Sequence, residues 1–128
     1  MKYYFNTTIA GDFDDVVQET IGALKKEGFG VLTEIDVKAT LKKKLDVDFK
    51  NYRILGACNP PFAFKALQAE DKIGTMLPCN VIVQETADNQ VEVAAIDPVA
   101  SMQAVGNPEL GEIASEIQAK LKKVIDSL

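Results

Sequence analysis

The chain has 128 residues, of which 47% are hydrophobic and 26% are charged. This length predicts one domain spanning residues 1–128, and it suffices to bury a core without disulfide staples. The composition excludes the disordered and collagen-like classes. The net charge of −5 supplies no cationic field for phosphates, so we expect no nucleic-acid partner.

The N-terminus lacks a signal-peptide pattern, and no apolar run approaches the length of a membrane span. The two cysteines are too few for a disulfide-rich secreted scaffold. We therefore expect a cytoplasmic protein with reduced thiols and no membrane partner. Residues 38–53 form a local basic segment, which we interpret as a solvated surface rather than an anion site.

Residue spacing along the chain predicts strands and helices in a definite order. The predicted strands cover residues 2–9, 29–37, 52–58, 79–85 and 91–97. The predicted helices follow Asp12, lie within 62–69, and follow Asn107, with a short helix or exposed excursion at 40–45 and one loose turn within 98–106. Asp12 and Asn107 are predicted N-caps, and Pro108 suits the first helical position.

This order predicts an α+β fold, a two-layer sandwich. We expect an antiparallel sheet with the two main amphipathic helices on one face and a short helix inserted between the third and fourth strands. The second face of the sheet would then lie bare. Apolar residues expected there, among Leu55, Ala57 and Ile82, predict a homodimer through the sheet in preference to a solvated polar face.

The chain contains no histidine, which removes the commonest general base and transition-metal ligand. Ser-His-Asp and Cys-His catalysis are therefore excluded. No phosphate-binding or dinucleotide-binding glycine motif is present, because Gly28 and Gly30 follow a helix and precede a strand. We favour a module that is not an enzyme.

Both cysteines lie in Cys-Asn pairs, Cys58-Asn59 and Cys79-Asn80, at the ends of facing predicted strands. If those strands are antiparallel neighbours, the thiols are close and three functions are open. The pair could be redox-active, or could bind a soft metal with Met76, whereas zinc would need two chains to share it. Cys58 could also be a nucleophile near the helix that begins at Pro60.

A structural alternative competes with each of these functions. Free cysteine is among the most buried residues, so both thiols could be core, which we favour over a site. Asn before Pro commonly begins a turn. Asp97, before Pro98, either ends its strand in a turn or places a carboxylate at the mouth of the same pocket.

Five blocks of sequence resemble one known family. They are residues 29–37, 41–44, 52–60 and 77–81, and the Asp97-Pro98 pair. Together, in this order, they are similar to the bacterial and archaeal domain-of-unknown-function 302 family. The resemblance implies a TATA-binding-protein-like β-α-β4-α fold and a dimer. It implies no activity, and likeness of fold does not transfer DNA binding.

The leading hypothesis is a cytoplasmic homodimeric module that binds a small ligand or a soft metal. The ligand site would comprise Cys58, Asn59, Cys79, Asn80 and Asp97, and the metal site Cys58, Cys79 and Met76. One alternative is a thiol redox enzyme or sensor that uses Cys58 and Cys79. Another is a module that binds a different protein through a surface left uncovered after dimerisation.

Overall fold

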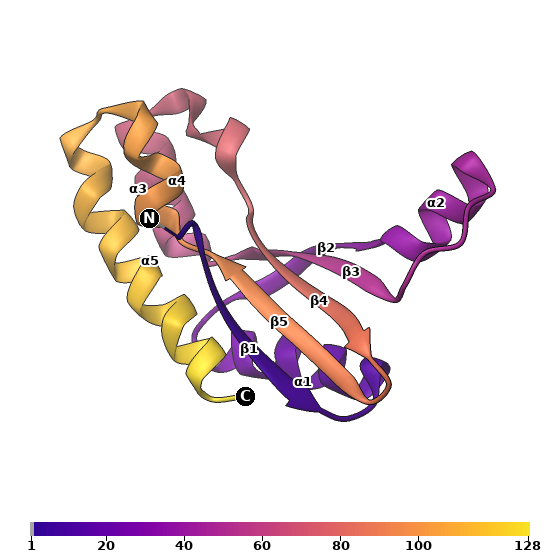
Figure 1. Cartoon of the computed structure of the whole chain (residues 1–128). Coiled ribbons are helices and arrows are strands. Elements are labelled where there is room, and N and C mark those ends of the chain that lie inside the picture. Colours follow the sequence, from indigo (N-terminus) through magenta and orange to yellow (C-terminus); the bar gives the residue numbers. More distant parts are fainter. Residues whose placement is uncertain (1) are drawn as a thin grey trace.

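The computed structural model describes residues 2–128, and its five strands form one antiparallel sheet (Figure 1). The strands are β1 (Tyr4–Ala10), β2 (Gly30–Asp36), β3 (Tyr52–Cys58), β4 (Cys79–Ala87) and β5 (Gln90–Ile96), and their order across the sheet is β1-β5-β4-β3-β2. The α-helices are α1 (Phe13–Lys26), α2 (Val37–Leu45), α3 (Pro60–Ala69), α4 (Pro98–Met102) and α5 (Pro108–Asp126). Two short 3-10 helices are η1 (Asp71–Met76) and η2 (Gln103–Val105). The predicted α+β class and the antiparallel sheet are confirmed.

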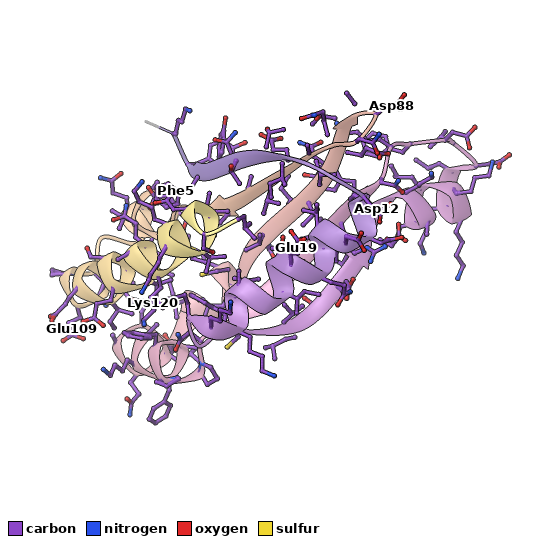
Figure 2. The ribbon with its side chains drawn as sticks, turned by 90° about the horizontal axis from the view of Figure 1, so that it is seen from below. Phe5, Asp12, Glu19, Asp88, Glu109 and Lys120 are labelled. Atoms are coloured by element: carbon purple, nitrogen blue, oxygen red, sulfur yellow. The ribbon has the colours of Figure 1, made fainter. Side chains whose placement is uncertain are left out.

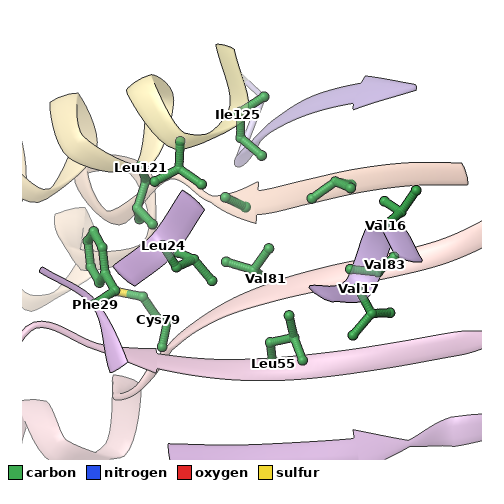
Figure 3. Close-up of a cluster of buried hydrophobic side chains, with 14 of the residues drawn as sticks. Val16, Val17, Leu24, Phe29, Leu55, Cys79, Val81, Val83, Leu121 and Ile125 are labelled. Atoms are coloured by element: carbon green, nitrogen blue, oxygen red, sulfur yellow. The ribbon is translucent and has the colours of Figure 1, made fainter. Parts of the chain in front are cut away.

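Helices α1 and α5 cover one face of the sheet, which we call the covered face, and they bury the main core there (Figure 3). Apolar residues recur at threes and fours along both helices, so each has one stripe that must leave water. The buried members of this cluster are Phe13, Val16, Val17, Leu24, Phe29, Leu55, Ala57, Cys79, Val81, Val83, Val91, Val93, Ala95, Ile117, Leu121, Val124 and Ile125. The predicted two-layer arrangement of helices on sheet is thus confirmed.

Both predicted N-caps lie at the start of their helices. The Asp12 carboxylate accepts a hydrogen bond from the Asp15 amide at 3.2 Å. The Asn107 side-chain oxygen accepts from the Glu109 amide at 3.0 Å. Each interaction satisfies one of the amides that the first turn of a helix leaves unpaired.

Residues 59–78 leave the sheet between β3 and β4 and form α3 and η1, a longer insert than the sequence predicts. This insert builds a second buried cluster beside the main core. Its buried members are Ala66, Ile73, Met102, Leu110 and Ala114, drawn from α3, η1, α4 and α5. The side-chain amide of Asn107 donates to the carbonyl oxygen of Ala69 at 3.0 Å, and this hydrogen bond joins the end of α3 to the start of α5.

The placement of Leu55 and Ala57 on the bare face of the sheet is wrong. Both are on the covered face, 0% and 1% exposed, where they pair with Val81 and Cys79 of β4. Successive side chains of a strand point to opposite faces, so Ile82, which follows Val81, lies on the other side. We call that side the open face; Ile82 and Glu92, on its central strands, are half-buried.

The segment from α2 to the start of β3, residues 37–51, projects from the body and is here called the arm (Figures 1 and 2). It contains the short helix expected at 40–45, which starts earlier, at Val37. The Asp36 carboxylate caps this helix by accepting from the Ala39 amide at 2.9 Å. None of its residues is buried.

Across residues 2–128, every helix is too short or too polar to cross a lipid bilayer.

Gly56 offers a test of the sheet packing. A Cβ atom there would collide with Oγ1 of Thr33 and lie 2.8 Å from Cγ of Pro78. We expect Gly56→Ala to lower the free energy of unfolding by about 1–3 kcal/mol, since overpacking a filled site forces its neighbours apart. Urea denaturation measures the change. The control, Gly111→Ala, adds a Cβ in open space on α5 and should raise stability by up to about 1 kcal/mol. Equal effects of the two variants would contradict this account.

Candidate functional site

A cavity of about 320 Å³ lies where the main core meets the second cluster, and we call it the α3 cavity. Its lining comprises Phe29, Leu32, Ala57, Cys58, Asn59, Phe62, Ala63, Ala66, Leu67, Gly74, Leu77, Pro78, Cys79, Met102, Ile113, Ala114 and Ile117. Ligand pockets in proteins typically measure about 300–1,000 Å³ and are mainly apolar with a few polar groups. The α3 cavity fits this description.

The two cysteines line this one cavity. Cys58 is the last residue of β3 and Cys79 the first of β4, and the register pairs Cys79 with Ala57, the neighbour of Cys58. The expectation that β3 and β4 are antiparallel neighbours is therefore confirmed. Both thiols are free.

Cys79 belongs to the core, close to Phe29, and is 8% exposed (Figure 3). Burial in these apolar surroundings raises the pKa of its thiol to about 11, and the neighbouring Cys58 contributes in the same direction. The thiol is then protonated at neutral pH, and a protonated thiol is a poor nucleophile and metal ligand. Cys58 is only half-buried and is therefore the more accessible of the two sulfurs.

Asn59 lines the cavity but has a structural contact of its own. Its side-chain amide donates to the carbonyl oxygen of Glu27 at 3.3 Å. The chain turns there at Gly28, whose φ of +86° lies in the region that glycine adopts readily, and a Cβ at Gly28 would approach the Asn59 amide to 3.1 Å. Asn59 thus ties the end of α1 to the start of α3.

Asn80 and Met76 lie outside the α3 cavity. Asn80 follows Cys79 on the same strand, so its side chain points to the open face, where it lines a separate hollow of about 420 Å³. Met76 ends η1 and is 40% exposed. The structure brings Cys58, Asn59 and Cys79 together and separates Asn80 and Met76 from them.

Asp97 also lies away from the cavity, at the N-cap of α4. Its carboxylate accepts from the Val99 amide and from Nε2 of Gln118, both at 3.0 Å. These contacts agree with the strand-ending turn that the sequence offered as one alternative. The carboxylate joins the end of β5 to α5.

The metal hypothesis gains little from this geometry. Within residues 2–128, no three or more histidine, cysteine or acidic side chains form a group that could hold a metal ion. The Met76 thioether is not among the side chains that line the cavity with the two thiols. The soft-metal site of Cys58, Cys79 and Met76 stays a prediction.

The open-face hollow contains a polar network that the sequence analysis missed. The Glu92 carboxylate accepts from Nδ2 of Asn6 at 2.8 Å and from Nε2 of Gln84 at 2.7 Å. Tyr52 lines the same hollow, and its pKa is raised. Burial is the main cause, and the negative charges of Glu92 and of ionised Tyr3 add to it. The alternation of side chains along β4 and β5 puts Gln84 and Glu92 on one face of the sheet. Their hydrogen bonds depend on which strands are neighbours, which the sequence does not show.

The sequence also gave no direct sign of the lining that comes from the helices. Ala63 and Ala66 of α3 and Ala114 of α5 are small residues, and their small side chains leave the space between these helices unfilled. The only available signal was alanine at helical spacing in α3, which is typical of close packing as well as of a cavity.

The thiols provide a test of this environment. At pH 7.5 we expect iodoacetamide to modify Cys58 while Cys79 reacts only after denaturation, because burial keeps the Cys79 thiol protonated until pH approaches its pKa of about 11. Mass spectrometry of peptides after timed labelling measures both sites. Cys58→Ser is the control and should leave native protein almost unlabelled. Labelling of Cys79 at the rate of a free thiol would refute this description.

Comparison with known proteins shows one family over almost the whole chain. The model of the domain of unknown function DUF302 matches residues 5–128. A crystal structure of the uncharacterized conserved protein DUF302 from Bacillus stearothermophilus is 27% identical, with a TM-score of 0.90, and the match covers 98% of each chain. No curated protein matches the chain. The family model and the shared fold agree with the resemblance found in the sequence, and the chain belongs to the DUF302 family.

Proposed function

We propose that this protein is a binding module that holds a small, neutral, mainly apolar molecule in the α3 cavity. The observation that carries the proposal is the cavity of about 320 Å³ at the junction of two apolar clusters. Unfilled apolar space lowers stability, because the lining atoms lose their packing partners. A ligand that filled the space would restore those contacts.

The lining supports this class of ligand. Among the described residues, none of the side chains around the cavity is charged. A charged ligand would therefore lose its hydration without gaining a partner, at a large free-energy penalty. The thiol of Cys58 and the amide of Asn59 are the polar groups at hand, and they can orient one weakly polar end of the ligand.

The rim of the cavity also supports entry from solvent. Leu32 and Leu67 line the cavity, yet they are 68% and 43% exposed. Large apolar side chains that face both a cavity and water are typical of a binding surface. The two free thiols agree with a reducing compartment, which supports a cytoplasmic location.

A thiol redox pair is the second candidate, and the shared cavity of Cys58 and Cys79 favours it. Peroxide would take the two thiol hydrogens as a disulfide forms, and it would be reduced to two water molecules. The raised pKa of Cys79 opposes this function, because thiolate is the reactive form. Intact mass after peroxide treatment distinguishes the two: loss of two hydrogens supports the redox pair, and an unchanged mass rejects it.

Filling the cavity tests the proposed binding. Ala63 lies half-buried on the cavity side of α3, so Ala63→Phe should place a ring in the space while the fold is kept. We expect the dissociation constant of N-phenylnaphthylamine, a neutral fluorescent probe, to rise by at least about tenfold. Fluorescence titration measures the constant.

Ala119→Phe on α5 is the matched control, because Ala119 is exposed and does not line the cavity. It should leave probe affinity unchanged. The proposal would be overturned if the unmodified protein failed to bind the probe. It would also be overturned if the two variants bound the probe equally tightly.

A further inference from the structure

The arm presents apolar side chains that a single chain leaves partly exposed, although the Phe49 ring packs against Tyr52. Leu45 is 66% exposed, Val47 43% and Phe49 40%. Helix α2, which leads to them, has no buried residue and contacts mainly β2 and β3 at its base. A row of exposed apolar side chains on a projecting segment is typical of an interaction surface.

The direction of the arm is set by contacts with the body. Arg53 of β3 forms an ion pair with Glu34 of β2 at 2.9 Å and lies 3.7 Å from Asp36. The backbone oxygen of Asp36 accepts from Oγ1 of Thr40 at 2.7 Å, in the first turns of α2. At the far end, Lys42 pairs with Asp46 at 2.9 Å. The arm is therefore an ordered helical segment with its own hydrogen bonds and ion pairs.

Strand β2 joins the arm to the α3 cavity along one edge of the sheet. It is the last strand in the order, so one side of its backbone has no partner strand among the described residues. Its first residue, Gly30, pairs with Cys58 at the cavity, and its last, Asp36, directly precedes the arm. A register shift between Val31 and Thr33 displaces Leu32 from the ladder, and Leu32 lines the cavity mouth.

An exposed strand edge is a template for another strand. When two copies of one strand pair antiparallel about a two-fold axis, each strand runs opposite to its partner. The arm end of one β2 then lies beside the cavity end of the other. Thr33 to Asp36, beyond the displaced Leu32, provide the straight part of the edge.

We propose that a second copy of this chain pairs along β2 and that its arm covers the open side of the α3 cavity. The apolar tip of the arm would meet the exposed rim residues Leu32 and Leu67. Each cavity would then be completed by the partner chain, and the two interfaces would be identical.

Charge complementarity supports a second copy as the occupant. Residues 37–51 contain five lysines and two aspartates, so the arm carries +3 while the rest of the chain carries −8. Figure 2 labels Glu109 at the end of α5 that neighbours α3. Glu109, Glu112 and Glu116 line a hollow next to α3 together with one cation, Lys65, so this surface is acidic on balance. A basic arm is attracted to the acidic body of another copy, which raises the rate and specificity of association.

The open face is a weaker interface for such a dimer. Its central Glu92 already has two hydrogen-bond donors, Asn6 and Gln84, and the surface around them is mixed polar and apolar. The homodimer predicted from the sequence is thus retained as a proposal, with the edge of β2 and the arm in place of the sheet face.

Sedimentation equilibrium of the full chain tests the dimer. We expect the mass of two chains, and at least a tenfold higher dimer dissociation constant for the double variant Leu45→Ser, Phe49→Ser. Both replaced side chains are exposed, so far-UV circular dichroism should be unchanged. Tyr3→Ser, equally exposed beside β1 at the opposite edge of the sheet, is the control and should dimerise normally.

Three results would overturn the proposal. They are a monomer at every concentration, an arm variant that dimerises as tightly as the unmodified protein, and a dimer lost on Ile82→Lys in the open face. Hydrogen exchange adds a readout for the strand edge: amides of β2 should be protected in the dimer and exchange faster in the arm variant. Fast exchange of β2 in a stable dimer would also refute the edge pairing.

The covering of the cavity rests on the proposed binding function, and the experiments separate the two. If N-phenylnaphthylamine binds, the arm variant should bind it at least threefold more weakly, and unchanged affinity would reject the cover. If the probe fails to bind the unmodified dimer, the binding function is wrong, while the measured masses still decide the dimer.

Discussion

Burial of one face of the sheet by α1 and α5 is the interaction on which this structure depends. Leu24 of α1 and Leu121 of α5 are fully buried against β-strand valines such as Val81. Each such side chain contributes about 1.5–3 kcal/mol through the surface it removes from water. The five strands and the two long helices must all contribute to this core. The segments between them therefore leave the core and return to it.

The α3 cavity follows from this constraint. The insert leaves β3 at Cys58 and returns to β4 at Cys79, and α3 packs beside α5 and η1. Small residues, such as Ala66 and Ala114, allow the two helices to approach but do not fill the space between them and the sheet. The second cluster and the main core thus meet at a seam that is apolar and incompletely packed.

The chemistry of that seam is governed by dehydration more than by reactive groups. Cys79 sits on the core side, where burial raises its pKa to about 11, and Cys58 sits nearer the rim. In the proposed function, such a site selects its ligand by shape and apolar surface. It differs from the open face, where Glu92 already accepts from two amides in mixed polar and apolar surroundings; Cys79 and Asn80, adjacent in sequence, lie on these different surfaces because strand side chains alternate.

The arm shows the opposite balance. It has no buried residue in its helix, it concentrates positive charge in an acidic chain, and it contacts the body at its base, where the backbone oxygen of Asn51 accepts from the Glu85 amide. In a single chain, the exposed apolar side chains of this segment gain little from burial. In the proposed dimer, pairing along the edge of β2 would direct this segment to a second copy of the chain.

Sequence alone determined the elements and their layers. The spacing of apolar residues predicted the two long helices, and Asp12 and Asn107 predicted where they start, because both signals are local to a segment. The order of these segments along the chain then predicted the α+β sandwich. It also brought Cys58 and Cys79 together through the neighbouring strands. It misplaced Leu55 and Ala57, since β3 is apolar on both faces and only distant helices decide which face is covered. The cavity, the polar network of the open face and the direction of the arm were decided by the tertiary structure, because each depends on how elements far apart in the chain pack together.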